Sequence, residues 1–157
     1  MTAVGSDSTD PGWLAEALVE TFPDAGVMPP LRLLGSGFDS VCIEDSSGLV
    51  FRVARSAGAG RAYAREARFL PRLAARVTTA IPVPLFHTRG SARFPCGAMG
   101  YRRLPGVTLT SGAATRPGGE RLASSLASFL AELHRFPVGE GLSLGLELLD
   151  GSTARPR

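Results

Sequence analysis

One short segment of the chain has the residue types that phosphate binding needs. It reads Leu34-Gly35-Ser36-Gly37-Phe38-Asp39-Ser40, and its two glycines let a backbone come close to a phosphate and turn its N–H groups toward the oxygens. A dinucleotide-binding loop has a third glycine near the place of Ser40 and opens a helix rather than a strand. The glycine pair alone also fits an ordinary hairpin turn, so both interpretations stay open at this point.

A carboxylate and a cation form the second candidate. At about 100° per residue, Glu66 falls near the centre of the apolar face of a predicted helix, where a carboxylate is costly unless it meets a cation. Arg52 lies in the apolar segment Leu49-Val50-Phe51-Arg52-Val53 and is a cation in a similar position. We expect the two to form a buried pair, which would cost about 3 to 5 kcal/mol to break. The alternative is that Glu66 lies at a helix end or reaches water.

The same predicted helix carries a stripe of arginines on another face. Its members are Arg61, Arg65, Arg68, Arg72 and Arg76. A solvated face is the interpretation that we favour, because no aromatic residues interleave with the arginines to stack bases. A nucleic-acid surface is the competing interpretation, and the net charge of +3 does not by itself imply nucleic acid.

The composition excludes several classes of site. The 157 residues include no Lys, so a Walker-type phosphate loop is excluded and all 17 basic residues are Arg. Two cysteines are too few for a disulfide scaffold or a four-cysteine zinc site. No stretch approaches the roughly 18 apolar residues of a membrane span, and the polar first ten residues do not resemble a signal peptide. We therefore expect a cytoplasmic protein without a membrane partner.

The hydrophobic patterns predict an α+β protein. We expect helices over 11–22, 60–77 and 120–136, strands over 31–38, 40–44, 49–55, 85–88 and 96–104, and a linker over 108–119. Pro71 should kink or break the second helix. The segment 137–157 is Leu-rich but interrupted by glycines, and the pattern assigns it no element.

In this order the segments resemble the aminoglycoside phosphotransferase family, which has a protein-kinase-like fold. The matching segments are the glycine-rich loop, Val50-Phe51-Arg52-Val53, Arg65-Glu66-Ala67-Arg68-Phe69-Leu70, Ile81-Pro82-Val83-Pro84, Gly100-Tyr101-Arg102-Arg103-Leu104-Pro105-Gly106-Val107-Thr108-Leu109 and Leu130-Ala131-Glu132-Leu133-His134. The resemblance implies a nucleotide-binding lobe over 1–98, in which a helix packs on an antiparallel sheet. It implies a hinge over 99–110 and, over 111–157, an incomplete carboxy-terminal lobe with only its first helix.

The resemblance also implies where a nucleotide would bind. In such enzymes a glycine-rich hairpin covers the phosphates of ATP or GTP, a basic residue on the third strand contacts them and pairs with a helix Glu, and a hinge holds the purine. Arg52 stands where the family often has Lys, and its planar fork can bridge phosphate and carboxylate. The expected nucleotide-binding residues are Gly35, Ser36, Gly37, Arg52, Glu66, Met99, Gly100 and Tyr101.

The sequence departs from the family at its catalytic groups. After the helix 120–136 the family carries a loop of the form His-Gly-Asp-x-x-x-x-Asn and then a metal-binding Asp, whereas here the only Asp after His134 is Asp150 and there is no Asn. We therefore expect no catalytic residue and no Mg²⁺ ligand in this chain. It looks like the amino-terminal part of a small-molecule O-phosphotransferase of the aminoglycoside or macrolide type, inactive by itself. The acceptor would bind only with the missing lobe.

Two other functions compete with this one. The chain could be a pseudokinase-like module that binds partners without catalysis, or a nucleic-acid-binding protein that uses the arginine stripe, which we do not expect. The apolar face of the helix 120–136 lacks most of the lobe against which the family packs it. We therefore expect self-association through this helix.

Overall fold

The computed structural model describes residues 10–107 and 119–147. Its elements are α1 (Pro11–Thr21), the short 3₁₀ helix η2 (Pro23–Ala25), β1 (Arg32–Ser36), β2 (Ser40–Glu44), β3 (Leu49–Ala54), α2 (Ala57–Ala74), β4 (Pro84–Thr88), β5 (Ala98–Arg102), α3 (Gly119–His134) and α4 (Val138–Ser143). Within the described ranges, every helix is too short or too polar to cross a membrane. The predicted α+β class is confirmed.

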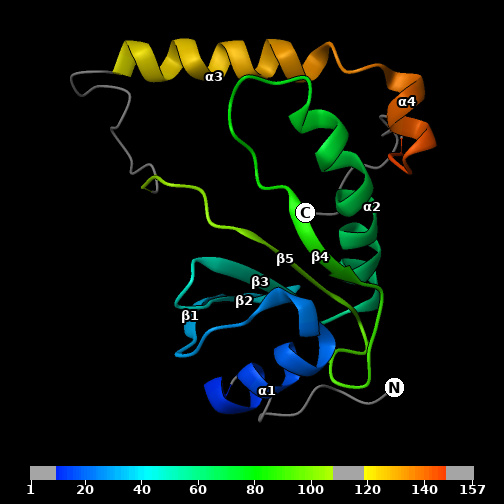
Figure 1. Ribbon diagram of the computed structural model, residues 1–157. Helices are drawn as coiled ribbons and strands as arrows, with labels where there is room; N and C mark the ends of the chain where they lie inside the picture. The colour runs from blue at the N-terminus through cyan, green and yellow to red at the C-terminus, as the bar shows by residue number, and fades with distance from the viewer. Residues whose placement is uncertain (1–9, 108–118, 148–157) are drawn as a thin grey trace.

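The five strands form one antiparallel sheet in the order β1-β2-β3-β5-β4 (Figure 1). The first three strands are neighbours along the chain, whereas β5 inserts between β3 and β4. Arg52 on β3 lies opposite Cys42 on β2 and Met99 on β5. The sheet therefore places Arg52 on its central strand.

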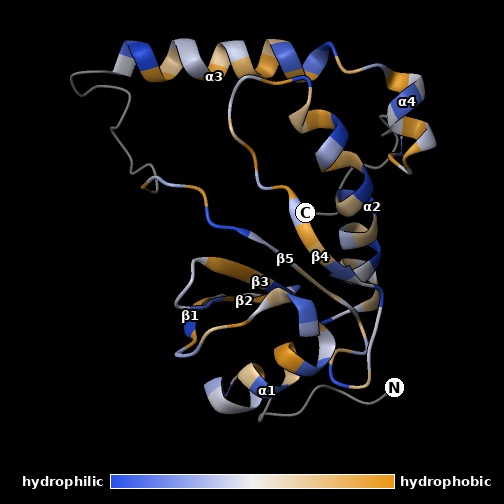
Figure 2. Cartoon of the chain, in the orientation of Figure 1, coloured by the Kyte–Doolittle hydropathy of each residue, from blue (hydrophilic) through white to orange (hydrophobic). Residues whose placement is uncertain are grey.

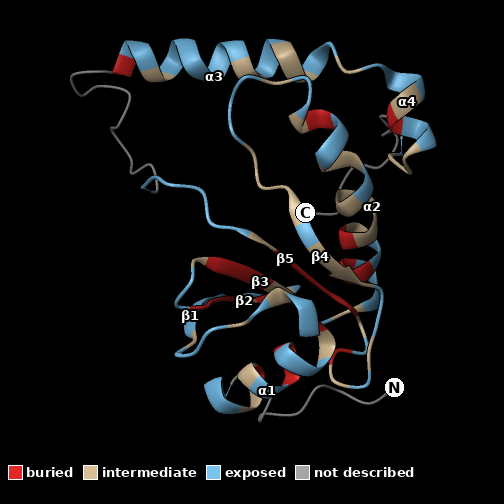
Figure 3. Cartoon of the chain, viewed as in Figure 1, coloured by how far each residue is buried: buried red, intermediate tan, exposed pale blue. Residues whose placement is uncertain are grey.

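The two faces of the sheet carry different cores. One face packs against α1 through Leu14, Ala17, Leu18, Val41, Ile43, Phe51 and Val53, all of which are buried. A second, smaller cluster joins α2 to the sheet through Ala54, Ala59, Tyr63 and Met99. Figure 3 shows buried residues concentrated on β3 and β5, and Figure 2 shows the matching apolar residues. The face beside α2 is thus the less completely covered one.

Local sequence explains where the first helix begins and ends. The Asp10 carboxylate accepts a hydrogen bond of 2.8 Å from the Trp13 N–H, and Pro11 occupies the first helical position. Pro23 follows the end of the helix and begins η2. This helix is confirmed nearly as predicted.

The second helix begins earlier than predicted. Ser56 caps it through its Oγ, which accepts a hydrogen bond from the Ala59 N–H, so α2 starts at Ala57 rather than near Gly60. The helix continues beyond Pro71 to Ala74, so of the kink or break expected at this proline the break is wrong. Gly60 allows close packing, because a Cβ there would lie 1.9 Å from the carbonyl oxygen of Cys96.

The last helices attach to the carboxy-terminal end of α2. The rings of Phe69 and Phe136 meet edge to face with centroids 4.9 Å apart, and Glu132 accepts hydrogen bonds from the backbone and hydroxyl of Thr78. The predicted helix 120–136 is confirmed as α3, while α4 was not predicted. The expected linker over 108–119 lies outside the described residues, except for Gly119. Asp150 also lies outside them.

Candidate functional site

The glycine-rich segment forms the hairpin between β1 and β2. Gly35 and Ser36 are the last residues of β1, and the Gly37 N–H donates to the carbonyl of Ser40 at 2.9 Å. The Phe38 side chain at the tip is 94% exposed. The segment is therefore a hairpin with its loop backbone at the surface, where a phosphate can approach it.

Arg55 holds this hairpin in place, and sequence reasoning missed it. Its guanidinium donates to the Ser36 Oγ at 2.7 Å and to the Gly37 carbonyl at 3.1 Å, while its backbone N–H donates to the Asp39 carbonyl at 2.9 Å. Arg55 follows directly after β3, and no sequence pattern points to its contacts with the hairpin. Arg55 thus fixes the loop and brings a positive charge to it.

Arg52 and Glu66 form the predicted ion pair. The Arg52 Nη1 lies 2.9 Å from the Glu66 Oε2, joining the central strand to α2. The expectation that the pair is buried is wrong, because the two side chains are 32% and 33% exposed. The core between α2 and the sheet is small and centred on Tyr63 and Met99, so the pair lies at its margin.

Tyr63 gives Arg52 a second contact. The guanidinium carbon lies 4.6 Å from the centroid of the Tyr63 ring, and this ring is only 1% exposed. Burial lowers the pKa of Arg52, but the charge interactions with Tyr63, Glu66 and Tyr101 outweigh burial and raise the pKa above its usual value. Arg52 is therefore a positioned cation that stays charged throughout the physiological pH range.

The residues expected to form a hinge lie within the sheet. Met99, Gly100 and Tyr101 belong to β5 and pair with β3 on one side and with β4 on the other, so the ladders use their backbone groups. Gly100 has a packing role, because a Cβ there would lie 2.8 Å from the Phe51 ring. The chain leaves the sheet only after Arg102, so the expected hinge over 99–110 begins within a strand.

The expected residues are thus brought together in part. Arg52, Glu66, Met99 and Tyr101 are neighbours between the sheet and α2, and the glycine-rich hairpin is connected to them through β2. Burial is the main cause that raises the pKa of Tyr101. In the part of the chain that the structure describes, no three His, Cys, Asp or Glu side chains gather as a metal site.

Solved structures of similar fold include several antibiotic phosphotransferases. The GDP complex of wild-type aminoglycoside 2'-phosphotransferase-IIIa is 28% identical with a TM-score of 0.79, over 90% of this chain and 48% of that one. The GDP and kanamycin complex of APH(2")-IIIa is also 28% identical, with a TM-score of 0.75, over 86% of this chain and 46% of that one. The macrolide 2'-phosphotransferase MphH from Brachybacterium faecium shares the fold at 22% identity, with a TM-score of 0.64 over 85% of this chain and 47% of that one.

The chain spans about half the length of these structures. The comparison with curated proteins finds no match. A family model described as "Phosphotransferase enzyme family" matches residues 30–155, which include the glycine-rich hairpin, the Arg52–Glu66 pair and the last two helices. This match, over most of the sequence, shows that the chain belongs to the phosphotransferase enzyme family.

Proposed function

We propose that this chain is the nucleotide-binding part of a phosphotransferase that moves a phosphoryl group from ATP or GTP to a small-molecule hydroxyl. The Arg52 guanidinium carries this proposal, because Glu66 holds it at 2.9 Å and the Tyr63 ring supports it from a second side. A guanidinium fork can bond a phosphate through the N–H groups that a carboxylate leaves free. Gly35, Ser36 and Gly37 would lie over the phosphates of the same nucleotide.

The purine would bind beyond β5. Met99 to Tyr101 use their backbone groups in the sheet, so they are poor candidates for purine contacts. The Arg103 N–H donates to the Gly48 carbonyl at 2.9 Å, and the chain then leaves the sheet toward Pro105. Proline has no N–H, so the amide of Leu104 is the donor that we propose for the purine.

The acceptor is proposed from the relatives. The similar structures are named as phosphotransferases of aminoglycosides or macrolides, and one of them is described as a kanamycin complex. We propose an acceptor of this kind, bound with groups beyond the described residues. The described residues would bind nucleotide without transferring its phosphoryl group.

Calorimetric titration without metal tests the nucleotide site. ATP and GTP are each titrated into the chain and into Arg52→Met, which keeps most of the side-chain volume and removes the charge. We expect Arg52→Met to weaken binding about tenfold or more, since a hydrogen bond to a charged group contributes about 1.5 to 3 kcal/mol. The matched control Arg72→Met removes the same charge from an exposed part of α2, and its affinity for ATP and GTP should stay within about twofold of that of the unmodified chain.

Two results would contradict the proposal. Absence of binding to both nucleotides, or equal weakening by Arg52→Met and Arg72→Met, would remove the nucleotide site. Phosphorylation of kanamycin or a macrolide by this chain with Mg²⁺ would leave the nucleotide site in place but would contradict the proposed lack of transfer.

A further inference from the structure

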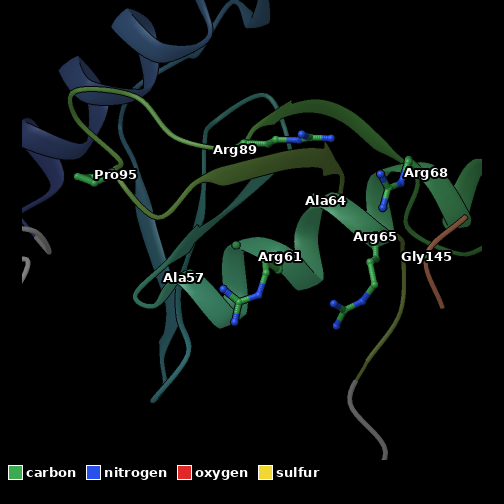
Figure 4. A pocket seen from close by; sticks show the side chains of 9 residues that line it. Ala57, Arg61, Ala64, Arg65, Arg68, Arg89, Pro95 and Gly145 are labelled. Atoms are coloured by element: carbon green, nitrogen blue, oxygen red, sulfur yellow. The ribbon is translucent and has the colours of Figure 1, made fainter. Parts of the chain in front are cut away.

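A second feature of α2 lies away from the Arg52–Glu66 pair. A pocket of about 450 Å³ opens between α2, the segment that follows β4 and the turn after α4 (Figure 4). None of the eight expected nucleotide-binding residues lines it, and β4 is the edge strand at the opposite side of the sheet from β1. The pocket is therefore separate from the glycine-rich hairpin. Its volume falls within the usual range of small-molecule sites.

Small residues form the floor of this pocket. Ala57, Gly60 and Ala64 lie on one face of α2, and Gly145 lies opposite them near Arg65 and Arg68. Residues with so little side chain leave room for a ligand to approach the helix itself. The hollow thus follows from the spacing of the alanines and the glycine along the helix.

Four arginines surround the floor. Figure 4 shows Arg61, Arg65 and Arg68 projecting from α2, with Arg89 reaching from the segment after β4. Arg65 lies 3.9 Å from Glu147, whose side chain is 83% exposed, and the Arg68 Nε donates to the Leu144 carbonyl at 3.2 Å. Among residues 10–107 and 119–147, no carboxylate forms an ion pair with the other three arginines. The pocket therefore has a strong excess of positive charge.

A neighbouring histidine responds to this charge. Burial is the first cause that lowers the pKa of His87, and the positive charges of Arg89 and Arg68 lower it further. The His87 Nε2 is buried, with no hydrogen-bond partner in the described residues. The positive potential of the arginines thus extends from the pocket into the edge of the sheet.

We propose that this pocket binds a small, multiply charged anion that carries phosphate groups. Guanidinium groups bond phosphate oxygens in pairs, and four of them around one hollow can neutralise several negative charges at once. A compact polyphosphate fits this arrangement better than a nucleic-acid strand, because the arginines line a pocket and, among the described residues, no aromatic side chain lines it for base stacking. The ligand would be either an inorganic polyphosphate or a phosphorylated metabolite, and both share this chemistry.

Calorimetric titration with inorganic tripolyphosphate at about 0.15 M salt tests the pocket, because exposed charge pairs are screened under that condition. Arg61→Ala/Arg89→Ala removes two of the four charges, and we expect it to weaken binding about tenfold or more. Arg72→Ala/Arg121→Ala is the matched control, since both residues are exposed and lie outside the pocket. This control pair removes the same charge, and its affinity for tripolyphosphate should stay within about twofold of that of the unmodified chain.

Two further variants separate the pocket from folding effects and from the nucleotide site. Ala64→Phe fills the floor and keeps all four arginines, so it should also weaken tripolyphosphate binding about tenfold. Tripolyphosphate resembles the phosphates of a nucleotide, so the comparison of Arg61→Ala/Arg89→Ala with the unmodified arginines is repeated in the Arg52→Met background, where the loss should persist. The unfolding temperature of each variant is measured alongside, and Ala64→Phe keeps the proposal testable if the double arginine variant fails to fold. A phosphorylated sugar is titrated in parallel. Tighter binding of the sugar than of tripolyphosphate would indicate a phosphorylated metabolite, and weaker binding would indicate an inorganic polyphosphate. Both results support the pocket as a phosphate site.

Four results would overturn the proposal. The first is that neither tripolyphosphate nor the phosphorylated sugar binds, and the second is that Arg72→Ala/Arg121→Ala weakens tripolyphosphate binding as much as Arg61→Ala/Arg89→Ala does. The third is that Arg52→Met weakens tripolyphosphate binding while Arg61→Ala/Arg89→Ala does not. The fourth is that Ala64→Phe binds tripolyphosphate as tightly as the unmodified chain. Tighter binding of a single-stranded oligonucleotide than of tripolyphosphate, with a salt dependence of several phosphate contacts, would also overturn it in favour of a nucleic-acid surface.

Discussion

The Arg52 Nη1 lies 2.9 Å from the Glu66 Oε2, yet each side chain keeps about a third of its surface exposed. Solvent screens a pair in this position, so its contribution to folding is smaller than that of a buried pair. The geometry instead determines where the Arg52 guanidinium lies, beside the buried ring of Tyr63. The pair therefore matters more for placing a cation at the sheet surface than for holding the fold together.

A double-mutant cycle measures this contribution. Arg52→Met, Glu66→Leu and the combined variant are compared by urea unfolding, and we expect a coupling free energy of about 1 kcal/mol or less. The expected value is small because water already reaches both charged groups. A coupling of about 3 kcal/mol would indicate the buried pair of the sequence-based expectation, and strictly additive losses would indicate no interaction at all.

Two glycines of α2 should respond oppositely to the same substitution. Gly60→Ala should destabilise the chain by about 2 kcal/mol, because the new Cβ would lie 1.9 Å from the Cys96 carbonyl oxygen and the turn before β5 would have to move. Gly58→Ala is the matched control in the first turn, where the nearest atom outside its immediate neighbours, the Ser56 Oγ, lies 3.6 Å from the new Cβ. It should stabilise by about 0.5 kcal/mol through helix propensity. Thermal unfolding of both variants provides the comparison, and equal effects would argue against the close contact at Gly60.

Strong local signals made much of the fold predictable from the sequence. Asp10 and Pro11 mark the start of α1, and apolar periodicity marks α3. The start of α2 was missed because the two glycines in Ala57-Gly58-Ala59-Gly60 lower its helix propensity, while Gly60 packs closely against the turn before β5. The position of β5 between β3 and β4 depends on contacts far apart in the sequence, which no local pattern encodes.

The site was predictable only where a charge occurs in an apolar context. Arg52 and Glu66 stood out because each lies among apolar residues in the sequence. An unpaired charge is costly in such surroundings, so the two were expected to pair. Arg55 lies at a strand end, where an arginine usually faces solvent, so its contacts with the hairpin gave no signal. The expected hinge over 99–110 includes residues of β5, because the sequence does not show that this strand has a neighbour on both sides.

Asp45 should be a main stabiliser of the turn between β2 and β3. Its carboxylate is buried and accepts hydrogen bonds from the backbone N–H groups of Met28, Ser47 and Leu49 and from the Ser47 hydroxyl. Asp45→Ala leaves these donors without an acceptor and should cost about 3 kcal/mol in unfolding free energy. Asp24→Ala, at an exposed position, is the control and should change it by less than about 0.5 kcal/mol. A small effect of Asp45→Ala would mean that water satisfies the donors.

The same carboxylate should make stability depend on pH. Burial raises the pKa of Asp45, but the hydrogen bonds from Met28, Leu49 and Ser47 outweigh burial and hold the pKa below its ordinary value of 3.8. The unfolded state therefore takes up the proton first as the pH falls. The stabilisation is complete above the ordinary pKa and is lost as the pH drops through the lower pKa of the folded state.

Urea unfolding of the chain and of Asp45→Ala between about pH 7 and pH 3 checks this sign. The difference in unfolding free energy between the two should be constant at neutral pH and should shrink below about pH 4. Glu44 adds a similar dependence to both proteins, because hydrogen bonds from Arg103 and then Arg32 lower its pKa. A difference that grows with acidity would contradict the assigned direction for Asp45.

The exposed face of α3 should drive self-association. Leu126 is 54% exposed and Leu130 is 40% exposed on the helix that extends away from the sheet (Figure 1). An apolar patch of this kind favours contact with a second copy, because burying each leucine contributes about 1.5 to 3 kcal/mol. Light scattering across a range of concentrations should show a rising average mass for the chain and a lower one for Leu126→Gln/Leu130→Gln. Val19→Gln replaces another apolar residue, 49% exposed on α1, and should leave the association unchanged. A constant monomer mass for the unmodified chain would show that this face does not associate.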